Sequence, residues 1–416
     1  ITREIAGVMG IDPRLIPAET AVDGHRYDPE AYEAYLRGQQ IIRQGASGPG
    51  ELKRAIAEFQ AAVRKDSALA PAWAQLGWSK AALWNNVTAD SALLEDAKAD
   101  GERALQLGGA EAEARQVLAY YHLMKGNRGA AKEETRRGLA ADPSNARLTG
   151  YTASFLELEG RWREALPYRE RAAALDPTAA GHAAGLATTL LWLRRYPEAR
   201  AAADRYIILA PTNPEAYQLR AMVALGEGRL EEARRIIRQG QEQIPETDLL
   251  PFVATYWDLY WVLDEDQKSR LLRMGPNHFS EDEVWWQIVT AAIKLDRGDT
   301  VGARASASSA RVKLLAQAED PVEAAYTQSR LGLVNAFLGR REEALRAAAR
   351  GVSLLPITQD ALNGSLIAYR LACVQARLGM EAEAAATLRT LLAVPFYVSP
   401  AWLRLDPNFK QIKSMP

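Results

Sequence analysis

The sequence predicts an all-α fold, a solenoid of about ten stacked helical hairpins. The main observation is a period of 34 residues in the middle of the chain, which several residue types keep independently. Four prolines follow this period: Pro143, Pro177, Pro211 and Pro245. Four alanines follow it as well: Ala131, Ala165, Ala199 and Ala233. A period of about 20 to 50 residues indicates a repeat architecture, because one hairpin alone cannot bury its apolar face.

Each repeat is predicted to be two helices joined by a short turn. The first helix carries apolar residues at helical spacing, as in Leu186, Leu190 and Leu191. A glycine such as Gly160 then ends this helix, since glycine adopts the left-handed conformation without a steric penalty. Arg194 replaces that glycine in one repeat. The second helix has alanine where two helices approach closely, and proline closes the unit.

These units resemble the tetratricopeptide repeat (TPR). The residues that carry the resemblance are Trp73, Leu76 and Gly77, then Ala55, Phe59 and Ala62, and in a late repeat Leu331, Gly332, Gly339, Ala344 and Pro356. The resemblance implies a right-handed α-solenoid in which the first helix of each hairpin lines a concave surface. It also implies binding of a protein or peptide on that surface rather than catalysis.

The repeat pattern divides the chain into six segments. They are an N-terminal helix and linker (1–28), two hairpins (29–111), four regular hairpins (112–247), a degenerate aromatic-rich hairpin (248–278), three further TPR-like hairpins (279–395) and a C-terminal cap (396–416). The cap is expected because a terminal repeat needs a cover for its apolar face.

The N-terminal stretch is similar to a junction in certain bacterial regulators, where a TolB-like segment precedes a TPR array. Such regulators often carry a protein kinase or a winged-helix DNA-binding domain upstream of a membrane helix. The resemblance implies that residues 1–28 are a remnant of an upstream domain. Kinase and DNA-binding signatures are absent from this sequence, so neither activity is carried over to it.

Composition argues against several classes of protein. The 416 residues include 51 basic and 52 acidic side chains, a formal net charge of −1. A nucleic-acid-binding protein needs an excess of basic residues, so nucleic acid is not an expected partner. No apolar run reaches the roughly 18 residues of a spanning helix, so membrane insertion by this chain is not expected. The compartment stays open between the cytoplasm and the periplasm or extracellular space.

No catalytic, cofactor-binding or metal-binding constellation is recognisable in the sequence. The acidic stretches at 264–267 and 280–283 lie where helices are expected to begin, which favours helix capping over calcium binding. Cys373 is the single cysteine and is expected to be a buried free thiol. Asn86 and Asn363 each begin a glycosylation-acceptor triplet in an expected insertion loop, and their modification is left open.

The TPR register gives a candidate partner-binding groove. Its lining is Trp78, Tyr120, Tyr151, Ser154, Thr188, Trp192, Gln218, Met222, Tyr326, Arg330, Tyr369 and Arg370. Aromatic rings together with arginine are typical of binding hot spots, so the expected partner is a protein or a peptide. The alternative for each residue is packing between helices.

A candidate aromatic patch is predicted in and after the degenerate hairpin. It consists of Tyr256, Trp257, Tyr260, Trp261, Trp285 and Trp286. Residues 251–263 are expected to form one helix that carries two aromatic stripes, each with a spacing of four residues. Either these rings fill the space left by a shortened second helix, or they form an apolar surface for binding or self-association.

Three functions follow from these observations. The first is a non-enzymatic scaffold that binds a protein or peptide in the concave groove. The second is a structural subunit that self-assembles or packs into a larger extracellular or membrane-associated assembly. The third is the sensor or docking region of a bacterial kinase or transcription regulator.

Overall fold

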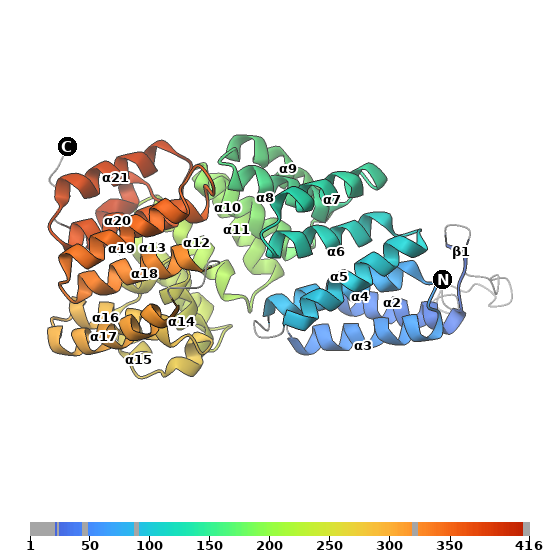
Figure 1. The fold of residues 1–416 in the computed structure, drawn as a ribbon, viewed down its shortest axis with the longest axis horizontal. Coiled ribbons are helices and arrows are strands. Elements are labelled where there is room, and N and C mark those ends of the chain that lie inside the picture. Colours follow the sequence, from blue (N-terminus) through green and yellow to red (C-terminus); the bar gives the residue numbers. More distant parts are fainter. Residues whose placement is uncertain (1–20, 23–24, 44–48, 87–90, 318–322, 411–416) are drawn as a thin grey trace. The chain divides into compact units, whose positions relative to one another are not determined.

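The protein is described by a computed structural model over residues 21–22, 25–43, 49–86, 91–317 and 323–410. It is an all-α fold of about 20 helices packed in consecutive pairs, a TPR-like solenoid, which confirms the predicted fold class (Figure 1). A two-stranded ribbon of β1 (Ala21–Val22) and β2 (His25–Arg26) precedes the helices. The helix predicted at the N-terminus falls outside the described residues. None of the described helices is long and apolar enough to cross a membrane.

The chain divides into two compact units at residue 152. Unit 1 contains α2 (Pro29–Arg43) and α3 (Pro49–Lys65), α4 (Ala70–Asn86) and α5 (Ser91–Leu107), α6 (Glu111–Met124) and α7 (Arg128–Ala141), and the beginning of α8 (Ala146–Leu158). Close approach of α2 and α3 depends on a small residue. A Cβ at Gly38 would lie 2.6 Å from the buried ring of Phe59, so a larger side chain does not fit there.

Unit 2 contains the remaining hairpins and the C-terminal elements. They are α9 (Trp162–Leu175), α10 (Ala180–Trp192), α11 (Tyr196–Leu209), α12 (Pro214–Gly226), α13 (Leu230–Gln241), α14 (Glu246–Thr255), η2 (Leu259–Val262), α15 (Glu265–Leu271), η3 (Pro276–Phe279), α16 (Glu283–Asp296), α17 (Thr300–Gln317), α18 (Ala324–Phe337), α19 (Arg341–Leu354), α20 (Asn363–Arg377), α21 (Glu381–Ala393), α22 (Pro400–Leu405) and η4 (Pro407–Phe409).

Both acidic stretches of unit 2 cap helices, as predicted. The Asp264 carboxylate accepts a hydrogen bond from the Gln267 amide, and the Gln267 side chain accepts one from the Asp264 amide, which completes a capping box. The Asp282 carboxylate accepts hydrogen bonds from the amides of Val284 and Trp285, both at 3.0 Å. These oxygens satisfy amides at the helix start that have no partner within the helix.

The prediction of one continuous aromatic helix over residues 251–263 is wrong. Helix α14 ends at Thr255, and Asp258 adopts a left-handed conformation with a φ of 57° before η2 begins. The break separates the rings that the helical spacing placed in two stripes. Tyr260 and Trp261 are buried in the core, whereas Tyr256 is exposed. No glycine or proline marks this break, so the sequence pattern did not predict it.

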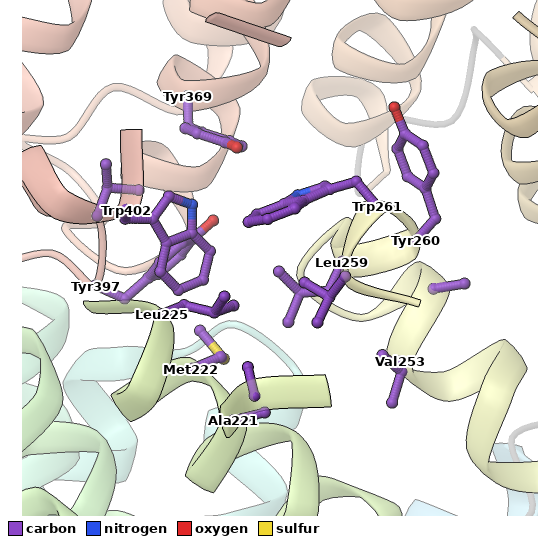
Figure 2. Close-up of a cluster of buried hydrophobic side chains, with 14 of the residues drawn as sticks. Ala221, Met222, Leu225, Val253, Leu259, Tyr260, Trp261, Tyr369, Tyr397 and Trp402 are labelled. Carbon is purple, nitrogen blue, oxygen red and sulfur yellow. The ribbon is translucent and has the colours of Figure 1, made fainter. Parts of the chain in front are cut away.

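The last residues of the described chain run back over earlier repeats of unit 2. We call residues 394–409 the return segment. Its large side chains are completely or almost completely buried: Phe396, Tyr397, Trp402 and Phe409. Figure 2 shows Tyr397 and Trp402 beside Met222 and Leu225 of α12 and near Trp261. The predicted cap therefore covers the inner side of distant repeats as well as the last hairpin.

Arg194 fastens this segment to the turn between α10 and α11. It keeps the left-handed conformation of the glycine that it replaces, with a φ of 58°. Its guanidinium donates hydrogen bonds to the carbonyl oxygens of Leu392, Val394 and Val398, at 3.1, 3.4 and 3.1 Å. The hydroxyl of Ser399 adds a bond to the Gly226 carbonyl at 2.7 Å. A strained backbone position is thus used to place a side chain that joins distant repeats.

A second long-range contact closes unit 2 near its first repeat. The backbone amide of Ala361, in the loop before α20, donates a hydrogen bond to the carbonyl of Leu158 at 2.9 Å. Leu158 is the last residue of α8. The beginning and the end of the repeat array of unit 2 therefore touch each other.

We predict that Arg194→Gly releases the return segment. Glycine removes the backbone strain, but the variant loses three hydrogen bonds, each worth about 1 kcal/mol net. Hydrogen exchange of the amides of residues 394–399 should become faster, and the free energy of unfolding should fall by about 1 to 3 kcal/mol. Arg195→Ala is the control, because Arg195 is a neighbouring, partly exposed arginine that pairs with exposed Glu198. Unchanged exchange in Arg194→Gly would contradict this assignment.

A buried ion pair in unit 1 predicts a pH dependence. Lys80 of α4 and Asp100 of α5 lie 2.7 Å apart, with side chains 12% and 8% exposed. Burial raises the pKa of Asp100 to about 6 even though Lys80 opposes the shift. Because the carboxyl binds its proton more tightly in the folded state, its stabilising contribution is complete below pH 4. It is lost as the pH rises through about 6.

We therefore expect wild-type protein to lose up to about 3 kcal/mol of unfolding free energy from this group between pH 4 and pH 7. Asp100→Asn should lack this component in urea unfolding measured across the same range. Asp96→Asn serves as the control, because Asp96 is largely exposed and 4.0 Å from Lys80. Parallel pH profiles of Asp100→Asn and wild type would rule the assignment out.

Candidate functional site

Unit 2 contains an open cavity of about 680 Å³ between α14, η3, α16, α18 and α20. We call it the Trp285 pocket. Its aromatic lining consists of Phe252, Tyr256, Trp257, Phe279, Trp285 and Tyr326; its charged lining consists of Asp248, Asp282, Arg330 and Arg370, beside the imidazole of His278. The volume and the combination of aromatic walls with polar and charged groups suit a ligand site.

One wall of the pocket is a row of aromatic rings on α14 and the turn after it. The rings of Phe252 and Tyr256 stack with centroids 5.0 Å apart, and Trp257 meets Tyr256 edge-on at 5.5 Å. Tyr256 is 48% exposed, which is unusual for a large aromatic residue. The break in the helix at Asp258 leaves this ring at the open side of the pocket instead of in the core.

Arg370 of α20 forms the floor and is fully paired. Its Nε and Nη2 donate hydrogen bonds to the two oxygens of Asp258 at 2.7 and 3.0 Å. Arg370 is only 4% exposed. Burial lowers the pKa of Arg370, but the Asp258 carboxylate outweighs burial and the net shift is upward. The pair ties α20 to the turn after α14, so it holds the pocket walls together.

Arg330 of α18 is paired much more weakly. Its carboxylate partner among the described residues is Asp282, whose Oδ2 lies 4.0 Å from Nη1. Within the part of the chain that the structure describes, its buried Nε has no hydrogen-bond partner. Burial, and then repulsion by Arg370, lower the pKa of Arg330. The pocket therefore holds a cation whose charge is incompletely compensated.

Trp285 contacts both of these cations. The guanidinium carbons of Arg330 and Arg370 are 5.0 and 4.9 Å from the centroid of its ring. Such cation–π contacts are favourable when the cation is partly desolvated. Tyr326 completes this end of the pocket, and burial raises the pKa of its hydroxyl to about 12. The hydroxyl is thus a neutral hydrogen-bonding group at physiological pH.

The predicted groove residues fall into three groups. Five are buried: Trp192, Gln218, Met222, Tyr369 and Arg370. Of these five, Arg370 also contributes to the lining of the Trp285 pocket. The return segment covers Trp192 and Tyr369. The ring centroid of Tyr397 lies 5.4 Å from that of Trp192 and 6.2 Å from that of Tyr369. Gln218 is covered by α14, where it donates a hydrogen bond to the Val253 carbonyl.

The remaining groove residues are partly exposed. Tyr326 and Arg330 line the Trp285 pocket. Ser154 accepts a hydrogen bond from Arg169, and Thr188 lies half-buried on α10.

In unit 1, Trp78 and Tyr120 meet edge-on at 5.6 Å, and the guanidinium of Arg147 lies 3.9 Å above the Trp78 ring. Tyr151 packs half-buried against Leu148 and neighbouring alanines. These three aromatic residues are partly buried and lie on three different helices, α4, α6 and α8.

The predicted aromatic patch is split in the same way. Tyr256, Trp257 and Trp285 line the pocket, whereas Tyr260 and Trp261 belong to the core. Trp286 is half-buried and donates a hydrogen bond to the Met274 carbonyl at 2.9 Å. The rings of the predicted patch are thus divided between the pocket lining and the core.

Several pocket residues were not predicted. Phe252, Phe279 and His278 lie on short elements that the repeat period does not cover. Asp258 carries no sequence signal, because its role depends on Arg370, which is 112 residues away. Asp282 was predicted only as a cap, and its second oxygen faces Arg330. Among the described residues, no three His, Cys, Asp or Glu side chains are grouped to hold a metal ion.

Cys373 is a buried free thiol, as predicted. Burial raises its pKa well above the usual value, so the protonated form predominates at neutral pH. Asn363 begins α20 instead of lying in an insertion loop, and its amide donates a hydrogen bond to Asp360 at 3.1 Å.

We predict that Asp258→Asn destabilises unit 2 strongly. Asparagine tolerates the left-handed backbone at this position, so the change mainly removes the charge that compensates Arg370. Leaving one partner of a buried pair uncompensated costs roughly 3 to 5 kcal/mol. Urea unfolding should show this loss, whereas Asp204→Asn should cost under about 1 kcal/mol, because Asp204 is half exposed and Arg220 keeps its bond to Glu232. Equal stability of the two variants would contradict the role of the pair.

One protein family and several solved structures are similar to parts of this chain. Residues 156–223 match the tetratricopeptide repeat family. None of the curated proteins matches the chain. PilF of Pseudomonas aeruginosa is 21% identical over 52% of this chain and 96% of that chain, with a TM-score of 0.39. Human IFIT1, solved as a dimer with PPP-AAAA, is 16% identical over 85% of this chain and 77% of that chain, with a TM-score of 0.46.

YrrB, described as a TPR protein with an unusual peptide-binding site, is 20% identical over 44% of this chain and 91% of that chain, with a TM-score of 0.31. None of these matches indicates a TolB-like segment, a kinase or a regulator. The TPR fold is typically non-catalytic and generally binds proteins. Residues 156–223 thus match the tetratricopeptide repeat, and the hairpins before and after them have the same two-helix architecture with left-handed turn residues.

Proposed function

We propose that this protein is a non-enzymatic interaction module that binds a segment of a partner protein at the Trp285 pocket. The observation that carries the proposal is the exposed ring of Tyr256 beside a cavity with an incompletely paired arginine. Exposed aromatic residues next to arginine supply most of the energy in many protein interfaces. We choose this pocket over the neighbouring groove residues of unit 2, because the return segment buries Trp192 and Tyr369 there.

The test is a peptide selection against the full chain. Random peptides displayed on phage are selected on wild-type protein, and the dissociation constants of the selected peptides are measured by calorimetry. Tyr256→Ala should weaken binding at least fivefold, which corresponds to about 1 kcal/mol for a modest hot-spot residue. The matched control is Tyr168→Ala, because Tyr168 is 39% exposed on α9 and does not line the pocket.

Peptides that bind both variants as tightly as wild type would place the binding surface elsewhere. The variant Trp78→Ala would then test the aromatic pair Trp78 and Tyr120 of unit 1. Selection of no peptide at all would remove the support for an interaction module of this kind.

Self-assembly is a second candidate function, favoured by one further observation. Helix α17 exposes three apolar side chains along one side: Val301 (80%), Val312 (69%) and Leu315 (48%). Exposed apolar residues that gather on one surface mark many association sites. Sedimentation equilibrium of wild type and Val312→Glu tests this function, and an association constant that falls by at least tenfold in the variant would support it.

A further inference from the structure

We infer that the Trp285 pocket selects a singly charged carboxylate adjacent to an aromatic or large apolar group, with Arg330 as the residue that binds the carboxylate. This inference rests on the proposed function and specifies the chemistry of the partner segment. It depends on the weak pairing of the Arg330 guanidinium, on the aromatic lining of the pocket, and on the acidic groups nearby.

Arg330 has donors available for a ligand. Arg370 uses two nitrogens on Asp258, whereas among the described residues the contact of Arg330 with a carboxylate is at the 4.0 Å limit of an ion pair. Its side chain is 20% exposed, so solvent or a ligand reaches it. A guanidinium binds a carboxylate through two parallel hydrogen bonds, a geometry that a half-buried cation favours strongly.

The apolar part of the ligand follows from the aromatic lining of the same cavity. Tyr256 and Phe252 contribute stacked rings to this lining, and Trp285 contributes a ring that contacts the guanidinium groups. An aromatic ring prefers to pack against such rings edge-on or offset. A carboxylate carried next to an aromatic or large apolar side chain therefore satisfies both parts of the pocket at once.

The acidic groups favour one negative charge over two. Asp282 faces Arg330, and exposed Asp248 lies at the rim of the same cavity. A phosphate monoester carries a charge of about −1.5 to −2 at pH 7 and is repelled more strongly by these carboxylates. Only one arginine is available to compensate it, since Arg370 is already paired. A carboxylate is thus the better match.

The first experiment compares two defined probes, N-acetyl-L-tryptophan and its carboxamide, by ligand-observed NMR with the full-length chain. We expect the carboxylate to bind wild type at least tenfold more tightly than the amide. Arg330→Gln should reduce this ratio to about one, whereas Arg346→Gln should preserve it, because Arg346 is a largely exposed residue of α19. Equal binding of the two probes to wild type, or binding of neither, overturns the inference.

Asp282→Asn tests the same point without removing the arginine. Asparagine still caps α16, so the fold should be retained, but the carboxylate that competes for Arg330 is gone. The affinity for the carboxylate probe should rise severalfold while that for the amide stays constant. If Arg330 had only a structural role, the affinity for the carboxylate probe would not increase. An unchanged affinity therefore overturns the inference.

The selected peptides separate this inference from the proposed function. Each Asp or Glu is replaced by its amide, and each C-terminus is tested free and amidated, which distinguishes side-chain from C-terminal carboxylates as the source. Peptides that depend on Tyr256 but bind equally well without any carboxylate retain the interaction module and overturn the carboxylate selectivity. A phosphorylated peptide that binds tenfold tighter than its carboxylate counterpart overturns it as well.

Discussion

The burial of the return segment between distant repeats is the constraint on which the architecture of unit 2 depends. In an open solenoid each hairpin contacts only its neighbours. Here Tyr397 contacts the rings of Trp192, Trp257, Tyr369 and Trp402 at centroid distances of 4.8 to 6.2 Å. A fully buried aromatic side chain contributes roughly 1.5 to 3 kcal/mol, so the few rings of this segment stabilise unit 2 substantially. They also leave only part of the inner surface open to other molecules.

The position of the Trp285 pocket follows from this closure. Trp257 contacts Tyr397 on one side and lines the pocket with its neighbour Tyr256 on the other. The break at Asp258 turns the chain so that Tyr260 and Trp261 enter the core while Tyr256 faces the cavity. Arg370 then fixes the break through its paired hydrogen bonds. Core packing and site geometry are thus set by the same short stretch.

The sequence was sufficient to predict the repeats, but it was not sufficient to predict the contacts between distant repeats. Periodic glycines, alanines and prolines determine local turns and helix pairs, so the hairpins could be placed from their spacing. Burial of Trp192 or Met222 depends on the return segment, which lies outside the period and about 200 residues away. The register therefore identified residues on inner faces, but it gave no information on which faces the chain itself covers.

Arg194 illustrates the same limit at one position. As a departure from the glycine pattern it was visible in the sequence, but its carbonyl partners were not.

The contact between Leu158 and Ala361 has a consequence for how this protein can change over evolution. Linear repeat arrays gain or lose whole repeats by duplication and deletion, because each new unit needs only a neighbour on either side. In unit 2 the first and last hairpins meet, so one additional repeat would separate Arg194 from the carbonyls that it binds. Gain or loss of a whole repeat in unit 2 would therefore break these closing contacts.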